Sequence, residues 1–320
     1  MRILFAGSPH IAVPSLDALA KTEGIRLAGV LTNPDTPKKR TGDQTPTEIA
    51  QAAEKLGVPV LKLKKLDAAA RDQVAALKPD LLVSFAYARL FGPKFLALFP
   101  LGGVNIHPSI LPKYRGPSPV QAAILNRDSE TGISIQTLSE KMDTGDILAL
   151  ERFQLTGRET AQSLGGIVSE KAALMLPDVL KKYASSAENS NVSGFGTPQN
   201  HSEASYCALV TMEDSFIDWK KSALEIDAQI RAFNPWPLSR TIHNGRELIV
   251  LKADVFSQLL NDGWKEQPGQ VLGINKQYGI LIQTGDGVLA VTELQYQAKK
   301  ALFWRDFLNG ARDFTGSLLG

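Results

Sequence analysis

The first 107 residues alternate short β-prone apolar runs with segments of helical periodicity, and this alternation constrains the fold more than any other feature. We predict strands at Arg2–Gly7, Ile25–Thr32, Val58–Leu61 and Asp80–Phe85, and in a run that ends at His107. Helices are predicted at Ile11–Ala20, Thr47–Leu56, Asp67–Leu77 and Pro93–Phe99. Strands that alternate with helices typically build a doubly wound, mainly parallel sheet, so an α/β domain is expected here.

The pattern changes twice after residue 107. Helices are predicted at Ser118–Asn126 and Glu159–Tyr183, with paired strands between them at Gly132–Ser139 and Ile147–Leu155. Residues 184–208 are rich in Ser, Asn and Gly and contain no Lys or Arg, which is typical of a linker. We therefore expect a first domain at 1–183 and a linker at 184–208.

Residues 209–320 are expected to form a second, mainly β domain. A predicted helix at Ser222–Phe233 precedes four β-rich runs, at Glu247–Val255, Gly269–Ile274, Tyr278–Thr284 and Gly287–Leu294. Closely spaced strands with few helices favour a small barrel or sandwich.

The composition of the chain limits the kinds of protein that it could be. The 320 residues are 43% hydrophobic and 21% charged with a net charge of +2, which is typical of a globular protein and too mild to indicate a nucleic-acid binder. Cys207 is the only cysteine, which excludes a disulfide within the chain and a four-cysteine zinc site. A strand that begins at Arg2 leaves no room for a signal peptide, and no apolar run approaches the roughly 20 residues that span a bilayer, so we expect a cytoplasmic protein. We also expect a monomer.

The first turn of the predicted Rossmann-like sheet lacks the motifs of the common nucleotide-binding enzymes. The turn reads Gly7-Ser8-Pro9-His10 and not G-x-G-x-x-G, and no G-x-x-x-x-G-K-[ST] occurs in the chain. A dinucleotide-dependent or ATP-dependent enzyme is therefore disfavoured.

Two polar residues end the last predicted strand of this series. Asn105 and His107 are two residues apart, so both side chains project from the same side of the strand. Ligands of doubly wound sheets bind beyond the carboxyl ends of the strands. An amide donor beside a group that titrates near neutral pH could hold an oxyanion and move a proton, although both residues could instead simply close the strand.

A tight loop, Met142–Asp146, presents two further carboxylates. Asp143 and Asp146 together with His107 could suggest a metal site, because three such ligands suffice for catalytic zinc. No H-x-x-x-H pair and no second nearby histidine are present, so we expect no metal.

Three of these motifs together resemble a known active-site signature. Asn105-x-His107, the loop Ser109-x-Leu111-Pro112 and Asp143-Thr144-Gly145 resemble those of 10-formyltetrahydrofolate-dependent formyltransferases, in which the aspartate lies 36 residues beyond the histidine as it does here. Similarity continues in Ile3–Pro9, Asn33-Pro34-Asp35, Arg115–Gln121 and Ile230–Pro237, and so extends over nearly the whole chain. It is closest to the family members that act on methionyl-tRNA, and it implies that the second domain is an OB-like β-barrel.

The resemblance implies transfer of the formyl group of 10-formyltetrahydrofolate to the amino group of initiator methionyl-tRNA, for translation initiation. Asn105 and a protonated His107 would donate hydrogen bonds to the oxyanion, a contact worth roughly 10²–10³ in rate per donor. Asp143 would raise the pKa of His107 and help to relay the proton.

Two binding segments are carried over from the resemblance. The folate pocket is expected from Ser109, Ile110, Leu111 and Pro112 and from Tyr87, Ala88, Arg89 and Leu90. Contacts with tRNA are expected from Lys38, Lys39 and Arg40, although the family's further lysines fall near Gly42 and Asp43 here, and a solvated charge run is the alternative. The second domain has 12 Lys or Arg against 13 Asp or Glu, and we expect Trp236 to pack the barrel.

Two alternatives remain. The chain could formylate a small amino-sugar nucleotide, or it could bind folate or RNA without catalysis. The basic segment and the second domain favour tRNA over the sugar. The complete set of Asn105, His107 and Asp143 argues against binding alone, because binding requires no such trio.

Overall fold

The computed structural model describes residues 1–37, 44–188, 196–257 and 266–320. The chain divides into two compact units. The first contains residues 1–119, 130–154 and 165–208, and the second contains 120–129, 155–164 and 209–320. Each unit is described by itself below.

A mixed seven-stranded sheet forms the centre of the first unit, in the order β5-β2-β1-β6-β7-β8-β9. Its strands are β1 (Arg2–Ala6), β2 (Arg26–Thr32), β5 (Val60–Lys62), β6 (Leu81–Phe85), β7 (Gly103–His107), β8 (Glu130–Thr137) and β9 (Ile147–Gln154). Strands β5, β2, β1, β6 and β7 are parallel, whereas β8 and β9 are antiparallel to their neighbours. The predicted Rossmann-like, mainly parallel sheet is confirmed.

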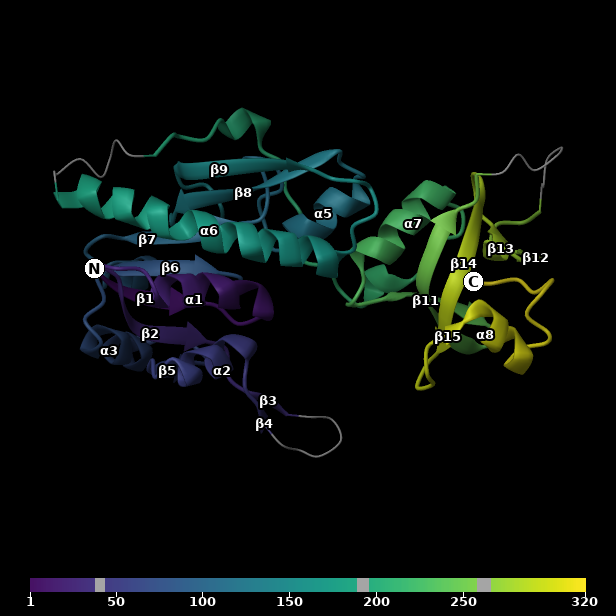
Figure 1. Cartoon of the computed structure of the whole chain (residues 1–320), viewed down its shortest axis with the longest axis horizontal. Helices are drawn as coiled ribbons and strands as arrows, with labels where there is room; N and C mark the ends of the chain where they lie inside the picture. Colours follow the sequence, from purple (N-terminus) through teal and green to yellow (C-terminus); the bar gives the residue numbers. More distant parts are fainter. Residues whose placement is uncertain (38–43, 189–195, 258–265) are drawn as a thin grey trace. The chain divides into compact units, whose positions relative to one another are not determined.

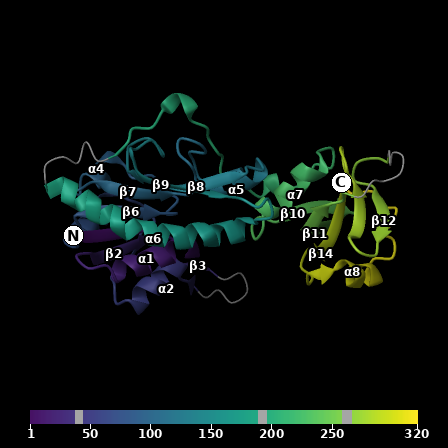
Figure 2. The same cartoon turned by 45° about the horizontal axis from the view of Figure 1, so that its top comes forward.

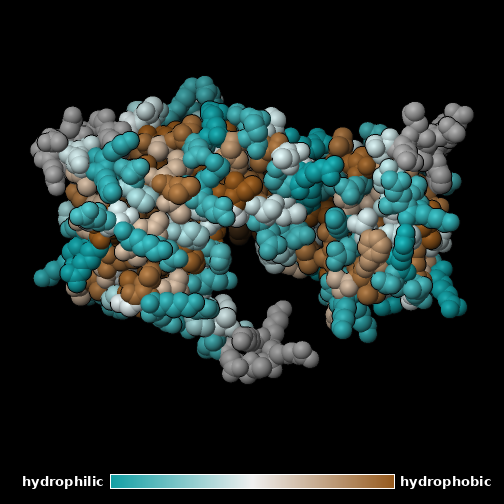
Figure 3. All heavy atoms as spheres, in the orientation of Figure 1, coloured by the Kyte–Doolittle hydropathy of each residue, from teal (hydrophilic) through white to brown (hydrophobic). Residues whose placement is uncertain are grey.

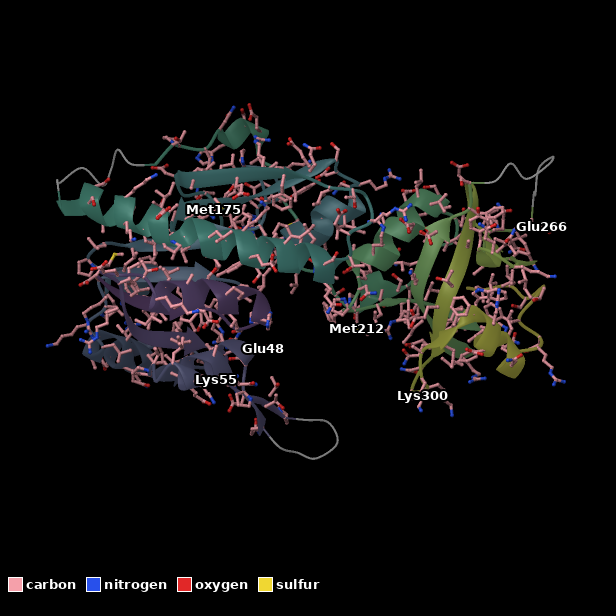
Figure 4. All side chains as sticks on the ribbon, in the orientation of Figure 1. Glu48, Lys55, Met175, Met212, Glu266 and Lys300 are labelled. Carbon is pink, nitrogen blue, oxygen red and sulfur yellow. The ribbon has the colours of Figure 1, made fainter. Side chains whose placement is uncertain are left out.

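Helices lie between the strands of this unit, and two of them begin at a residue whose side chain caps the helix. The helices are the short η1 (His10–Ala12), α1 (Val13–Ala20), α2 (Glu48–Lys55), α3 (Ala68–Ala76), α4 (Pro93–Leu96), α5 (Pro119–Leu125), which continues into the second unit, and α6 (Ala161–Glu188), which enters from it. Thr47 and Asp67 cap α2 and α3 by accepting from the backbone three residues later. Figure 4 labels Glu48 and Lys55 at opposite ends of α2, where an acid near the N-terminus and a base near the C-terminus complement the helix dipole.

Helices cover both faces of this sheet. A hydrophobic cluster joins Leu4 and Leu82 of the strands to Val74 of α3 and Phe95 of α4, which places α3 and α4 on one face. The opposite face carries α1 and α2, which pack together, and α6, whose Ser169 hydroxyl donates to the carbonyl of Ile11 in η1 (2.7 Å). In both Figure 1 and Figure 2, α6 runs alongside the sheet.

Strand order defines where a ligand fits. From β1 the chain moves to β2 and β5 on one side, and it then returns to β6 and β7 on the other side. Such a reversal opens a crevice at the carboxyl ends of the two central strands. The segments that leave these ends are Gly7–Pro9 after β1 and Ala86–Leu90 after β6, with His107 at the end of the next strand.

The second unit is built around an antiparallel sheet. Its strands β10 (Ser239–His243), β11 (Arg246–Val255), β14 (Val288–Tyr296), β13 (Gly279–Gln283) and β12 (Val271–Asn275) are neighbours in that order, and β15 (Leu302–Phe303) pairs with β14. Helices α7 (Ala223–Ala232) and α8 (Trp304–Gly310) pack on it around a core that includes Trp219, Ile226 and Phe314. The predicted β-rich second domain is confirmed as an antiparallel sheet domain.

Strand β10 and helix α8 are among the elements of this unit that were not predicted. The buried side chains of β10 are Ser239, Thr241 and His243, so the strand carries no apolar alternation. Helix α8 spans only residues 304–310, which is too short for a clear helical period.

The exposed surface is mixed in character. On the face shown in Figure 3, hydrophilic and hydrophobic residues are interspersed on both units, as is usual for folded domains in contact with water. Within the described ranges, no helix has the length and apolar content needed to cross a membrane.

Candidate active site

Strand β7 presents its polar residues beside polar residues of both neighbours. Asn105 lies opposite Ser84 of β6 and Gln136 of β8, and His107 lies opposite Ser134 of β8. Directly opposed residues project from the same face of a sheet. Asn105 and His107 therefore share a hydrophilic strip at the carboxyl end of β7, as their spacing predicts.

His107 is held between two oxygen atoms. Its Nε2 lies 2.9 Å from the carbonyl oxygen of Tyr114, and its Nδ1 lies 3.6 Å from Oδ1 of Asp143. The residue is 4% exposed. Burial lowers the pKa of His107 below its ordinary value, while Asp143 and the Tyr114 carbonyl act in the opposite direction.

We predicted that Asp143 would raise the pKa of His107, and the carboxylate does act in that direction. The cost of desolvating a charged ring is larger than this attraction, so the net shift of the pKa is downwards. The neutral ring is therefore the resting form near pH 7. A protonated ring would nevertheless face an oxygen at each nitrogen, so the site is arranged to accept a proton transiently.

Asp143 is fixed by a strained loop and by two donors. Its φ is +54°, in the left-handed region that non-glycine residues rarely adopt. Its Oδ2 accepts from the backbone N–H of Gly116 (2.9 Å), and its Oδ1 accepts from Nε2 of Gln136 (3.0 Å). A Cβ at Gly145 would lie 1.8 Å from the carbonyl oxygen of Thr137, so only glycine lets the loop approach β8 this closely.

Asn105 differs from its neighbours because its side chain is free. The residue is partly exposed, and its amide makes no hydrogen bond within the part of the chain that the structure describes. An amide that is placed beside His107 and has no protein partner can donate to a bound molecule.

The loop after β7 is pinned to β8. The Ser134 hydroxyl donates to the carbonyl oxygen of Ser109 (2.7 Å) and accepts from the N–H of Leu111 (3.0 Å). Ser109 and Leu111 are buried, whereas Ile110 and Pro112 are partly exposed. Of the four residues predicted to contact folate here, Ser109 and Leu111 thus fix the loop, and Ile110 and Pro112 offer accessible surface.

The loop after β6 also contains both buried and exposed residues. Tyr87 is 1% exposed and its ring stacks on Phe91, whereas Ala88 and Leu90 are exposed. The backbone groups of Ala88 and Leu90 make no hydrogen bond with any other described residue. The Nδ2 of Asn33 joins this loop to the first turn, because it lies 2.9 Å from the Ser8 hydroxyl and 3.4 Å from the carbonyl of Tyr87.

The structure does not describe the residues that are predicted to bind tRNA. Lys38, Lys39 and Arg40 lie outside the described residues. Among the residues that are described, no group of three or more His, Cys, Asp or Glu side chains could hold a metal ion. Asp146 contributes to the turn through its backbone, because its N–H donates to the Thr137 hydroxyl.

Sequence reasoning missed the residues that support the trio. Gln136 and Ser134 lie on β8 directly opposite Asn105 and His107, and Gly116 supplies its N–H to Asp143. Only the pairing register of β7 with β8 could have identified the first two. A Cβ at Gly116 would lie 2.3 Å from the carbonyl oxygen of Cys207, which explains the requirement for glycine there.

The second unit contains an open groove of about 870 Å³. Its charged lining mixes cations with carboxylates: Arg158, Arg231, Lys252, Asp227, Asp254 and Glu293. Balanced charge of this kind does not favour a polyanion. Trp236 is 54% exposed, so our expectation that it packs inside the domain was wrong: the turn holds its ring at the surface.

Comparison with known proteins identifies the family. The sequence pattern of the family described as formyl transferase matches residues 1–180, and that of the formyl transferase C-terminal domain matches residues 209–312. A methionyl-tRNA formyltransferase from Treponema denticola is 46% identical over 323 residues, with 98% of each chain covered.

Solved structures support the fold. The chain resembles HypX from Aquifex aeolicus in complex with tetrahydrofolic acid, with a TM-score of 0.62 and 19% identity over 98% of this chain, and it spans about half of HypX (48%). It also resembles an N-formyltransferase from Helicobacter canadensis in complex with folinic acid and dTDP-3-aminofucose, with a TM-score of 0.62 and 22% identity over 90% of this chain and 98% of that one. Because both family patterns match this chain and a methionyl-tRNA formyltransferase is 46% identical to it over 98% of its length, the chain belongs to the formyl transferase family, and within that family to the methionyl-tRNA formyltransferases.

Proposed function

We propose that this chain transfers the formyl group of 10-formyltetrahydrofolate to the free amino group of initiator methionyl-tRNA. The observation that carries the proposal is the convergence of Asn105, His107 and Asp143 at the carboxyl end of β7, with His107 and Asp143 3.6 Å apart. Together they supply a free donor, a buried imidazole and an oriented carboxylate, which are the groups that acyl transfer to an amine requires.

The reaction proceeds by addition and elimination. The amine nitrogen of the aminoacyl group attacks the formyl carbon, a C–N bond forms, and the carbonyl electron pair moves onto oxygen. The oxyanion then collapses, the bond from the formyl carbon to N10 breaks, and N10 takes up a proton. The amine loses one proton, so the products are formylmethionyl-tRNA and tetrahydrofolate.

Each member of the trio has a separate role in this proposal. The unpartnered amide of Asn105 donates to the oxyanion. Asp143 orients the His107 ring and stabilises it when it is charged, and the pair takes up the proton that the amine loses. The 3.6 Å separation is longer than a hydrogen bond, as catalytic contacts often are before substrate binds.

Folate fits the loop after β6 better than the buried part of the loop after β7. The unpaired backbone groups of Ala88 and Leu90 can bind the donor and acceptor edge of a pterin, and the exposed Leu90 side chain can cover its flat face. Ile110 and Pro112 would contact the same ligand from the other loop, and Arg89 lies between the two backbone contacts. Tyr87, Ser109 and Leu111 shape the pocket from behind.

Recognition of tRNA is assigned to Lys38, Lys39 and Arg40, together with the second unit as an OB-like barrel. Strands β3 (Thr36–Pro37) and β4 (Gln44–Thr45) pair antiparallel on either side of the basic segment. Three adjacent cations can neutralise backbone phosphates, which makes binding dependent on salt. We propose that the chain acts as a monomer in the cytoplasm.

A comparison of acceptors tests the function. Purified protein is supplied with 10-formyltetrahydrofolate and with charged initiator tRNA, charged elongator tRNA or an amino-sugar nucleotide. We expect formylation of the initiator tRNA, and replacement of all three cations by Ala should raise KM for tRNA while kcat is kept. Formylation confined to the sugar nucleotide would establish the other acceptor class instead.

A further inference from the structure

Two buried amide side chains, Gln136 and Gln199, connect Asp143 to Arg115 through a chain of hydrogen bonds. Nε2 of Gln136 donates to Oδ1 of Asp143 (3.0 Å), and Oε1 of Gln136 accepts from Nε2 of Gln199 (3.1 Å). Oε1 of Gln199 in turn accepts from Nε (3.1 Å) and Nη2 (2.6 Å) of Arg115. Arg115, Gln136 and Gln199 are all at least 90% buried, with exposures of 2%, 1% and 7%.

The two ends of this chain determine the orientation of both amides. An arginine can only donate, and an ionised carboxylate can only accept. Gln199 must therefore turn its oxygen to Arg115 and its NH₂ group to Gln136, and Gln136 must turn its own NH₂ group to Asp143. Neither amide can rotate by 180° without bringing two donors or two acceptors together.

Gln199 also fixes the loop that carries Asp143. The same Nε2 lies 3.0 Å from the carbonyl oxygen of Asp143 and 2.7 Å from that of Gly145. Because the loop has a left-handed residue at Asp143, these contacts stabilise a conformation that is otherwise costly.

The segment around Gln199 is itself tied to the loop after β7. Its Ser205 carbonyl accepts from the N–H of Arg115 (2.9 Å), and the N–H of Cys207 donates to the Arg115 carbonyl (2.8 Å). Nη2 of Arg115 also lies 2.8 Å from Nδ1 of His201. The guanidinium is thus held on both sides, and it provides a rigid anchor for Gln199.

We propose that Gln199, oriented by Arg115, is a positioning residue for formyl transfer: it holds Asp143 towards His107 through Gln136. Neither Gln199 nor Arg115 touches the reacting atoms. The inference rests on the proposed function for its kinetic consequences, but the geometry of His107 and Asp143 is open to direct measurement.

The test replaces Gln199 with Met, which has similar length and no amide. We expect kcat to fall about 10- to 100-fold, since a misplacement of about 1 Å at a reacting group has effects of this order. KM for 10-formyltetrahydrofolate should change less than about threefold, because the hydrogen bonds of the Gln199 side chain go to Arg115, Gln136 and the Asp143 loop, and none goes to the described loop after β6. Asn200→Ala is the matched control, because the hydrogen bonds of that side chain stay within residues 200–203.

A second measurement needs no substrate. In protein with isotope-labelled histidine, the titration of the His107 ring is followed by NMR in the wild type, Gln199→Met and Asn200→Ala. Asp143 raises the pKa of His107, so a displaced carboxylate should shift the titration midpoint downwards in Gln199→Met alone. Should Gln199→Met fail to fold, Gln136→Met interrupts the same chain one step nearer to Asp143, with the same expected shifts.

The outcomes distinguish the positioning role of Gln199 from the proposed function of the chain. A folded Gln199→Met protein with kcat within twofold of the wild type, or with an unchanged His107 midpoint, overturns the positioning role. Wild-type protein that transfers no formyl group to any acceptor overturns the proposed function instead, and the titration still tests the geometry.

Discussion

Asp143→Asn removes one negative charge and leaves the size of the side chain unchanged. The carboxylate accepts at both oxygens, from Gly116 N–H at 2.9 Å and from Gln136 Nε2 at 3.0 Å. An asparagine has one acceptor, so one of these two donors would face an NH₂ group. The substitution therefore breaks one charge-assisted hydrogen bond and leaves a donor without a partner.

The expected losses of stability and of kcat can be estimated from these contacts. A lost hydrogen bond to a charged group costs about 1.5–3 kcal/mol. At roughly 2–4 °C per kcal/mol for a unit of this size, Tm should fall by about 3–12 °C. Loss of the proton-accepting carboxylate should lower kcat by about 10²–10⁴, which is far more than the unfolded fraction at 25 °C could explain.

Calorimetry and initial rates of formyl transfer measure the two effects separately. Asp146→Asn is the matched control, because it makes the same change three residues along a loop where the carboxylate has no hydrogen bond to a described residue. The control should alter stability by less than about 0.5 kcal/mol. If Asp143→Asn kept a tenth or more of the wild-type kcat, the assignment of the carboxylate to proton transfer would be wrong.

Three further predictions concern other positions. Asn105→Ala should lower kcat by about 10²–10³ with Tm unchanged, because the amide has no partner within the described ranges to lose. Ser222→Ala removes the capping box with Glu225 at the start of α7 and should destabilise the second unit by about 1 kcal/mol in thermal unfolding, with formyl transfer intact. Burial lowers the pKa of His107, so the unfolded chain binds that proton more tightly than the folded chain does. The free energy of unfolding should therefore fall as the pH drops below about 6.5, and denaturant titrations at about pH 7.5 and 5.5 should show a flatter dependence in His107→Gln, with His243 accounting for part of what remains.

The sequence predicts those elements of the fold whose residues show a clear apolar pattern or a local capping signal. The Leu81–Phe85 strand is buried along its whole length and reads as a continuous β-prone run, and the N-cap at Asp67 follows from local chemistry. Strand β10 was missed because its inward side chains are polar: Thr241 accepts from the Trp219 ring N–H, and His243 bonds Tyr296. Polar residues are buried there because partners from distant segments satisfy them, and such partners are not visible in a local pattern.

In the proposed active site, too, some residues could be identified from local spacing and others could not. Asn105 and His107 could be identified because two residues of spacing place them on one face of a strand, whereas Gln199 lies in a stretch whose composition resembles a linker. The segment functions through one buried amide whose partners come from β8, the Asp143 loop and the loop after β7. The match to the formyl transferase N-terminal pattern ends at residue 180 and leaves this amide outside it. A fragment ended at that boundary would keep Asp143 and lose the Gln199 amide that bonds its loop. We therefore expect a fragment with formyl-transfer activity to need the chain at least to residue 207, where the N–H of Cys207 donates to the Arg115 carbonyl.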